Sequence, residues 1–298
     1  MSKGILVFAR NNTQIDYLKQ AYFLAIKAKE LLNLPTTVVT DSLDYLKKSY
    51  PDYNKVFDKV ISIVWKHEDL INEYTVLSKT ENHSLRTYRD GTIVKKKLYF
   101  KNETRSVAYD VTPYDETLLL DSDILLLDNL YLNCFTQPND FLIYDKAYDI
   151  AGFREKSQFD FISNQGVKFY WATVIFFRKT YENKIFFDLV QHIQENWRHY
   201  KRVFQIEKNL YRNDFVFSIA IHIMNGYQEG SFSHAMPGKL FYTTDKDICY
   251  AFDNESVLFL LEKEKYVGEY TLSRWKNNSI HVMNKFSYNR CIDKVING

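Results

Sequence analysis

Two aspartates, Asp121 and Asp123, lie one residue apart within the leucine-rich stretch YDETLLLDSDILLLDNL at residues 114–130. Leucine runs are normally buried, and an unpaired buried carboxylate costs several kcal/mol. Residues i and i+2 of an extended segment project to the same side, so both carboxylates face one point and repel each other unless a cation is present. Mg²⁺ and Mn²⁺ prefer such oxygen ligands. The pattern predicts a divalent metal site; the alternative is a turn in which Asp121 caps backbone amides.

The strand before these aspartates determines where they lie. Residues 117–120 (TLLL) are typical of a central parallel strand that is apolar on both faces, which places Asp121 at its carboxyl end. In open α/β sheets, ligands bind in the crevice outside the carboxyl ends of the strands. The chain begins with a βαβ pattern: a buried strand at 4–9, an amphipathic helix to Leu32 with Asn12 or Thr13 as its N-cap, and a second strand at 36–41.

The remaining pattern predicts one α/β domain over residues 1–298, with a mixed, mostly parallel central sheet flanked by helices and with C-terminal elaborations. No internal repeat or Pro/Gly-rich linker divides the chain. The other elements we expect are a strand at 60–65, a β-hairpin around Asp90-Gly91, a helix at 95–109, strands at 141–145 and 170–177, a helix at 185–197, a helix or strand at 215–224 and a strand-rich tail from Lys239.

Composition excludes several classes of protein. A net charge of +2 gives no overall field for a polyanionic partner, although basic residues cluster at 95–105 and 197–202. These clusters are solvated faces or, alternatively, nucleic-acid contacts. The three cysteines form no CxxC pair, which predicts neither a zinc site nor a disulfide framework. We expect a cytoplasmic protein with no membrane span and no obligate protein partner.

Three stretches resemble the nucleotide-sugar-binding half of GT-A glycosyltransferases: LVFARNN at 6–12, TTVVTD at 36–41 and the leucine-rich stretch at 114–130. The resemblance implies a GT-A type, Rossmann-like fold whose Asp-x-Asp motif holds Mn²⁺ or Mg²⁺ on the diphosphate of a nucleotide-sugar donor. By family resemblance the donor is a UDP-sugar, and the enzyme is a metal-dependent hexosyl- or pentosyltransferase. Residues 1–130 would bind the donor, and residues 131–298 would bind the acceptor and supply a C-terminal metal- and phosphate-binding tail.

The general character of the sequence, including its composition, is also similar to that of glycosyltransferases of T4-like phages. Some of those are thought to decorate hydroxymethylated cytosine in phage DNA. This likeness makes double-stranded DNA containing 5-hydroxymethylcytosine the favoured acceptor, in the cytoplasm of a host cell. A saccharide or a protein is the rival acceptor. Outside the glycosyltransferases, a nucleotidyltransferase or a non-catalytic DNA-binding protein also fits the pattern.

The resemblance assigns donor contacts to residues near the ends of the early strands. Each has a plainer interpretation as a helix-start, turn or salt-bridge residue. The nucleotide-contacting residues would be Ala9, Arg10 and Asn11, with Asp41 accepting from the base or ribose and with Arg105 and Asp121 near the diphosphate.

The tail sequence HVMNK at 281–285 resembles the C-terminal His-x-x-Gly-x-x-Lys element of glycogenin-like retaining transferases. The resemblance implies that His281 completes the metal shell and that Lys285 binds the diphosphate. The spacing here is shorter, and Asn284 replaces the glycine of the family. The alternative is a structural histidine in a strand.

Asp214 precedes an apolar segment, where related enzymes place an acidic residue near the acceptor or the anomeric carbon. If the reaction inverts configuration, Asp214 is the candidate general base for the acceptor hydroxyl. If the reaction retains configuration, Asp214 positions the sugar or stabilises positive charge on it. A plain helix N-cap is the alternative. Gln165, Gly166 and Trp171 are candidates for the acceptor side.

Overall fold

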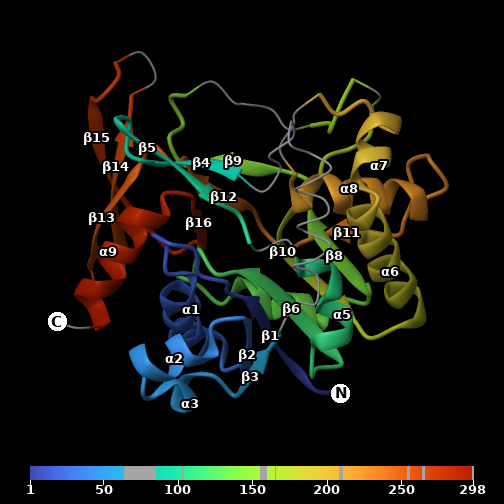
Figure 1. Cartoon of the computed structure of the whole chain (residues 1–298), viewed down its shortest axis with the longest axis horizontal. Helices are drawn as coiled ribbons and strands as arrows, with labels where there is room; N and C mark the ends of the chain where they lie inside the picture. Colours follow the sequence, from blue (N-terminus) through green and yellow to red (C-terminus); the bar gives the residue numbers. More distant parts are fainter. Residues whose placement is uncertain are drawn as a thin grey trace.

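The computed structural model describes residues 1–63, 85–101, 104–154, 160–164, 166–207, 211–253, 256–263 and 266–296. A seven-stranded sheet forms its centre, in the order β11-β8-β10-β6-β1-β2-β3 (Figure 1). All neighbours pair in parallel except β10, which is antiparallel to both β6 and β8. The strands are β1 (Lys3–Phe8), β2 (Thr36–Thr40), β3 (Lys59–Ser62), β6 (Glu116–Asp121), β8 (Phe141–Tyr144), β10 (Trp171–Arg178) and β11 (His234–Ala235).

The central strands form because their residues are apolar on both faces. Positions 4–8 of β1 and 116–120 of β6 are all buried, as a strand covered by helices on both sides requires. The parallel register pairs Phe8 with Asp121, which puts the ends of β1 and β6 at one edge of the sheet. The predicted fold class, a mixed and mostly parallel sheet flanked by helices, is therefore confirmed.

Helices gather in two groups in Figure 1: α1, α2 and α3 beside the β1–β3 half of the sheet, and α6, α7 and α8 beside the β8–β10 half. Of the two structures predicted for 215–224, the helix is correct. The helices are α1 (Tyr17–Leu32), α2 (Leu43–Ser49), α3 (Tyr53–Val56), α5 (Ala108–Val111), α6 (Tyr181–Glu195), α7 (Trp197–Val203), α8 (Asn213–Met224) and α9 (Lys285–Ile296), with the 3-10 helices η1 (Thr104–Val107) and η2 (Leu130–Thr136).

The N-cap of α1 differs from the prediction. Asp16, not Asn12 or Thr13, caps the helix, because its side chain accepts from the amide of Lys19. Asn12 instead closes the preceding loop, since its Oδ1 accepts from the amides of Gln14 and Ile15. The helix therefore starts one turn later than the sequence suggested.

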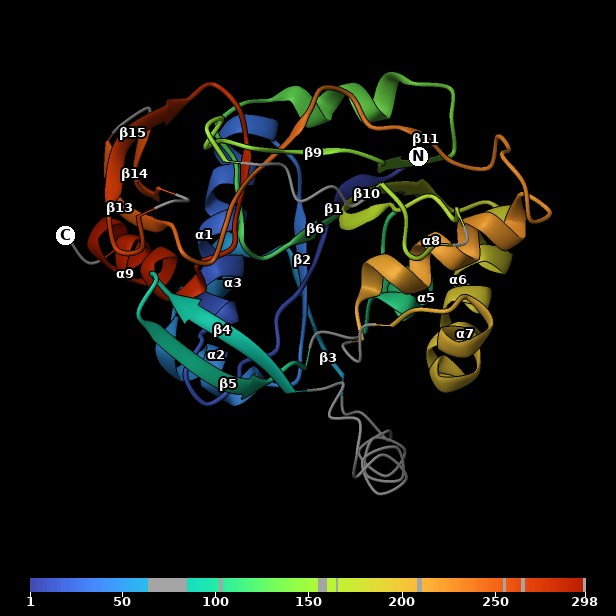
Figure 2. The ribbon, with the colours of Figure 1, turned by 90° about the horizontal axis from the view of Figure 1, so that it is seen from above.

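Smaller sheets cover one end of the central sheet. Figure 2 shows β13, β14 and β15 with α9 on one side of the molecule and α6, α7 and α8 on the other. These sheets comprise β7 (Ile124–Leu125), β16 (Ile280–Val282), β12 (Leu240–Thr243) and β9 (Ala147–Asp149); then β13 (Ile248–Asp253), β14 (Ser256–Glu262) and β15 (Tyr270–Lys276); and finally β4 (Leu85–Asp90) with β5 (Val94–Tyr99).

The predicted hairpin around Asp90-Gly91 is confirmed as β4 and β5, but the predicted helix at 95–109 is wrong. Its first third is strand β5, which pairs with β4 from Val94 to Tyr99, and of the residues described here only 104–111 are helical, in the short η1 and α5. Cross-strand pairing after the tight turn overrides the helix propensity of the lysine run. Within the described residues, no helix is long and apolar enough to cross a membrane.

Candidate active site

The chain turns at the end of β6 so that both aspartates meet the tail of the protein. Asp121 ends β6, and Asp123 lies between β6 and β7. Strand β7 pairs antiparallel with β16, which sets His281 opposite Ile124. The amide of Val282 donates to the carbonyl of Asp123 at 2.9 Å, which fixes this register.

Asp123, His281 and Lys285 form a close cluster although they are far apart in sequence. The Asp123 Oδ2 atom lies 2.9 Å from His281 Nε2, a residue 158 positions away, and 2.6 Å from Lys285 Nζ. Both Asp123 and His281 are buried. Lys285 reaches the carboxylate from the first turn of α9, whose start is held by Asn284: its Oδ1 accepts from the amide of Ser287. Asn284 thus has a local structural role at the position of the family's glycine.

The charges in this cluster keep Asp123 ionised. Burial by itself would raise the pKa of the Asp123 carboxyl, because it penalises the charged form. The neighbouring His281 and Lys285 outweigh burial, so the pKa lies well below its usual range. A deprotonated carboxylate is what metal coordination requires.

The donor set fits a divalent cation. Asp121, Asp123 and His281 each offer one ligand atom, and all of these atoms lie within 4.8 Å of one another. Ligands on opposite sides of one ion lie about 4.2–5.2 Å apart for bond lengths of about 2.1–2.6 Å, so one ion can contact all three. The buried His281 Nδ1 has no hydrogen-bond partner among the described residues, so the cluster is not complete by itself.

Arg105 completes the polar surroundings of Asp121. The buried guanidinium of Arg105, in η1, forms an ion pair with Asp121. Burial lowers the pKa of Arg105 to about 10, which leaves it charged at neutral pH. The structure therefore brings a cation to the first aspartate of the motif, and a contact of Arg105 with the donor stays a prediction.

Arg10 and Asp41 meet at the same edge of the sheet, after β1 and β2. The Nε atom of Arg10 lies 2.9 Å from Asp41 Oδ2, and its Nη1 donates to the carbonyl of Lys101 at 2.9 Å. Ala9 is buried, and its amide donates to the carbonyl of Val39. These positions stay predictions for donor contact, because each also has a local structural partner.

Asn11 has local hydrogen-bond partners at both ends of its side chain, and its contact with the nucleotide stays a prediction. Its Nδ2 donates to Asp16 at 2.9 Å, and its Oδ1 accepts from the amide of Leu18 at 3.0 Å. Both ends of the side chain are thus used to hold the start of α1, and a contact to the nucleotide would have to displace one of them.

Asp214 lies in the first turn of α8, near Arg105, and is not its N-cap, which is Arg212. One Asp214 oxygen accepts from the amide of Ala172 at 2.9 Å, and the other lies 2.6 Å from the guanidinium of Arg212. Burial acts to raise the pKa of Asp214, but Arg212, the Ala172 amide and Arg105 lower it below its usual value. A carboxylate held ionised in this way accepts a proton weakly, which argues against general-base catalysis.

The three candidates for the acceptor side lie in different surroundings. Gly166 lines a surface groove beside α8. Trp171 is buried, with its ring stacked on Tyr242 at 5.7 Å between centroids. Gln165 lies outside the described residues.

No local sequence pattern predicts the aromatic and basic groups that the β4–β5 hairpin adds. The hydroxyl of Tyr88, on β4, lies 3.2 Å from the hydroxyl of Tyr17, and Arg86 lies near Tyr17. The charge of Asp123 helps to raise the pKa of buried Tyr17, after burial and Tyr88. This side of the site depends on a long-range approach of the hairpin to α1.

No family model matches the chain, and no curated protein matches it in sequence. Among solved structures it is similar to the galactosyltransferase LgtC in complex with donor and acceptor sugar analogs, with 12% identity over 84% of this chain and 75% of that one and a TM-score of 0.45. Mouse xyloside xylosyltransferase 1 has 13% identity over 79% and 85%, with a TM-score of 0.44.

The glycosyltransferase GlyE of Streptococcus pneumoniae TIGR4 has 11% identity over 79% of this chain, with a TM-score of 0.43. The present chain spans only 45% of the length of GlyE. All three likenesses are distant, so we base the function on the residues of the site.

Proposed function

We propose that the protein is a metal-dependent glycosyltransferase that uses a nucleotide-diphosphate sugar as donor. The observation that carries the proposal is the meeting of Asp121, Asp123 and His281 with Lys285 at the carboxyl edge of the parallel strands. Two acids and an imidazole suit a divalent ion, and the adjacent ammonium suits the phosphates that the ion would hold.

The residues around this point have separable roles in that reaction. A bound Mn²⁺ or Mg²⁺ supplies Lewis-acid stabilisation of the charge that develops on the leaving diphosphate. Lys285 and Arg105 add fixed positive charge on the same side. In the site as described, Lys285 neutralises Asp123; with a cation on Asp123, its ammonium becomes available to the diphosphate.

The ribose and base of a UDP-sugar would lie toward the ends of β1 and β2. Arg10 and Asp41 are paired there, and Asp41 can accept from a ribose hydroxyl or a uracil N–H. Asp214, ionised beside Arg105, is suited to stabilise positive charge on the sugar or to position it. This supports the role predicted for a retaining reaction over that of a general base.

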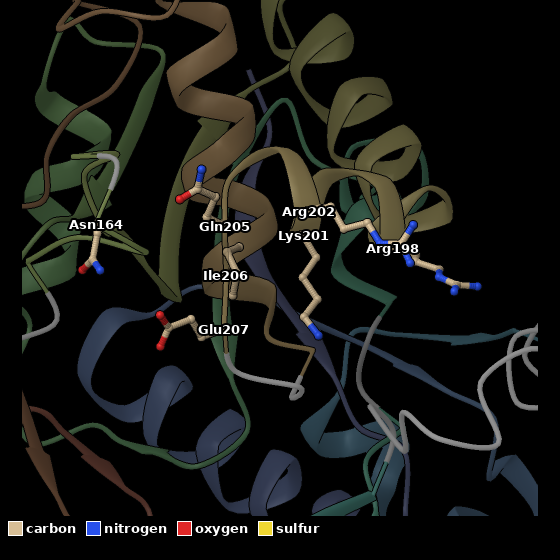
Figure 3. A pocket seen from close by; sticks show the side chains of 7 residues that line it. All are labelled: Asn164, Arg198, Lys201, Arg202, Gln205, Ile206 and Glu207. Carbon is tan, nitrogen blue, oxygen red and sulfur yellow. The ribbon is translucent and has the colours of Figure 1, made fainter.

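The sequence left two acceptor classes, and one group of residues bears on 5-hydroxymethylcytosine in DNA. Arg198, Lys201 and Arg202 on α7 line a hollow of about 250 Å³, and Figure 3 shows the side chains of Arg198 and Arg202 projecting to the same side. Exposed cations of this kind suit phosphates. These residues lie on α7, apart from the sheet edge that carries Asp121, so they do not determine which acceptor the protein uses.

Release of nucleoside diphosphate from a panel of nucleotide sugars tests the proposal. Each donor is incubated with the protein and Mn²⁺, with EDTA as the metal-free control, and with hydroxymethylcytosine DNA, plain DNA or a saccharide mixture as acceptor. We expect release from at least one donor, abolished by EDTA and in Asp123→Asn. Release that persists in EDTA, or no release and no donor binding, would contradict the assignment. Consumption of a nucleoside triphosphate instead would identify a nucleotidyltransferase.

A further inference from the structure

A groove of about 780 Å³ lies beside α8. Its walls are the residues after β8, the segment that precedes β10, and the second half of α8 with the loop that follows it. Asp145 follows β8, Tyr170 precedes β10, and Ser218 and His222 lie on α8.

The groove opens at the same edge of the sheet as the metal-site aspartates. Both β6 and β8 run antiparallel to β10, so they run parallel to each other, and Asp145 leaves β8 at the edge where Asp121 ends β6. Helix α8 follows this edge: Asp214 accepts from the amide of Ala172, and Ser218, one turn later, accepts from the amide of Tyr170. The groove thus begins one helical turn beyond Asp214.

Exposed aromatic rings line the groove. Phe161 and Tyr227 are 57% and 66% exposed, and both rings lie on the same groove. Tyr227 has a φ of 65°, in the left-handed region that non-glycine residues seldom adopt. Flat rings of this type present an apolar face against which the C–H face of a sugar ring can pack.

The charges of the groove favour a neutral ligand. Carboxylates outnumber ammonium groups by three to two, and Lys168 is already paired with Asp145 at 2.7 Å. Burial lowers the pKa of His222, so it is neutral at physiological pH and adds no positive charge. Carboxylates accept hydrogen bonds from hydroxyl groups, whereas a nucleic-acid backbone requires clustered cations.

We propose that this groove binds the acceptor of the reaction and that the acceptor is a neutral saccharide. This inference rests on the proposed glycosyltransferase function. An acceptor hydroxyl oxygen forms the new bond to the anomeric carbon of the donor sugar. The bond from that carbon to the phosphate oxygen breaks, its electron pair leaves with the nucleoside diphosphate, and the hydroxyl proton is released to solvent.

Binding can be tested without catalysis, on an array of immobilised neutral and anionic oligosaccharides. The protein is applied as wild type, as the double variant Phe161→Ala/Tyr227→Ala, and as Tyr181→Ala, a matched control whose ring is 82% exposed and lies outside the groove. Both altered rings are exposed, and alanine tolerates the backbone of Tyr227 as well as tyrosine does, so each variant should fold.

We expect wild type and Tyr181→Ala to bind a set of neutral oligosaccharides with equal affinity, and the double variant to bind them at least about tenfold more weakly, as loss of two stacked rings implies. No binding to any neutral oligosaccharide, or equal binding by the double variant, would overturn the proposal. In a parallel binding assay with hydroxymethylcytosine DNA, a double variant that loses affinity for the DNA instead would also overturn the proposal. Asp123→Asn reports separately on the transferase assignment, because its loss of donor cleavage does not depend on these rings.

Discussion

Two clusters of buried charge show how differently one chain can use ion pairs. In the Arg154 cluster, Arg154 joins Asp149 and Asp247 through bonds of 2.7–2.9 Å, with a further bond to Thr244. In the Asp123 cluster, defined by Asp121, Asp123, His281, Lys285 and Arg105, one carboxylate oxygen receives both His281 and Lys285, while His281 Nδ1 has no partner among the described residues.

The difference lies in how completely each cluster satisfies its own groups. All five N–H donors of Arg154 have an acceptor, and Asp247 also accepts from the amides of Thr244 and Glu262. Burial acts to lower the pKa of Arg154, but the two carboxylates raise it above its ordinary value. A saturated cluster of this kind holds β9, β12 and β14 together. The Asp123 cluster is unsaturated and lies at the ligand-binding edge of the sheet, so it can rearrange around an ion.

The largest effect should come from Asp123→Asn. The variant loses one metal ligand and the counter-charge of Lys285, so we expect donor cleavage to fall by about 10³-fold or more. Timed assays of nucleoside diphosphate release measure this loss of donor cleavage directly. Asp140→Asn, which alters an exposed carboxylate paired with Arg178, is the matched control and should keep full activity. Equal activity in both variants would show that Asp123 has no role in catalysis.

Arg154→Met should lower stability and leave turnover unchanged, the reverse of the loss of activity that we expect for Asp123→Asn. Removing Arg154 leaves the buried carboxylate of Asp247 and the partly buried one of Asp149 without their cation, and we expect the free energy of unfolding to fall by about 3–5 kcal/mol. Urea denaturation measures the loss, and turnover per folded molecule should stay close to wild type. Arg154→Lys keeps the charge but loses the two-pronged geometry, so it should lie between the two. A variant with full stability would show that the Arg154 cluster has no structural role.

His281→Ala tests the imidazole as a ligand. We expect the Mn²⁺ concentration for half-maximal activity to rise by about tenfold or more, with a smaller change in the maximal rate, because two carboxylates remain. A metal titration of donor cleavage separates the two quantities. An unchanged half-maximal concentration would assign His281 to a structural role only.

Asp41→Asn should have the smallest effect. Asp41 lies beside Arg10 at the proposed nucleoside end, away from the bond that breaks. Loss of one hydrogen bond to the ribose or base raises the donor KM by about 5–10-fold with little change in kcat. Asp44→Asn, which alters an exposed carboxylate in the first turn of α2, serves as the control. A fall in kcat without a change in KM would move Asp41 out of the donor site.

Local patterns predicted the parts of the site that lie on single strands. The continuous apolar residues of β1 and β6 fix a parallel pair, and the pair places Asp121 at the carboxyl edge. The same reasoning failed at 95–99, where pairing with β4 determines the structure, and at Asn12, whose side chain closes a loop one turn before the helix. Propensity describes isolated segments; the first error comes from pairing with another strand, and the second from hydrogen bonds of Asn12 to the amides that follow it.

The contacts between distant segments of the site could not be predicted from the spacing of residues in the sequence. The approach of His281 and Lys285 to Asp123 depends on the β7–β16 pairing, which brings together residues 158 positions apart, and only the family resemblance suggested it. The ion pair between Arg212 and Asp214 joins neighbours in the sequence, yet its effect on the pKa of Asp214 follows from burial and from the distant Arg105. The aromatic groove beside α8 likewise exists only once β8, β10 and α8 have packed.

The most direct test of the central claim is a measurement of Mn²⁺ binding to the purified chain by isothermal titration calorimetry, with wild type and Asp123→Asn side by side. If Asp121, Asp123 and His281 form a metal site, wild type binds one Mn²⁺ per chain and Asp123→Asn binds it at least about tenfold more weakly. Absence of binding in wild type, or equal binding by the variant, would contradict the account.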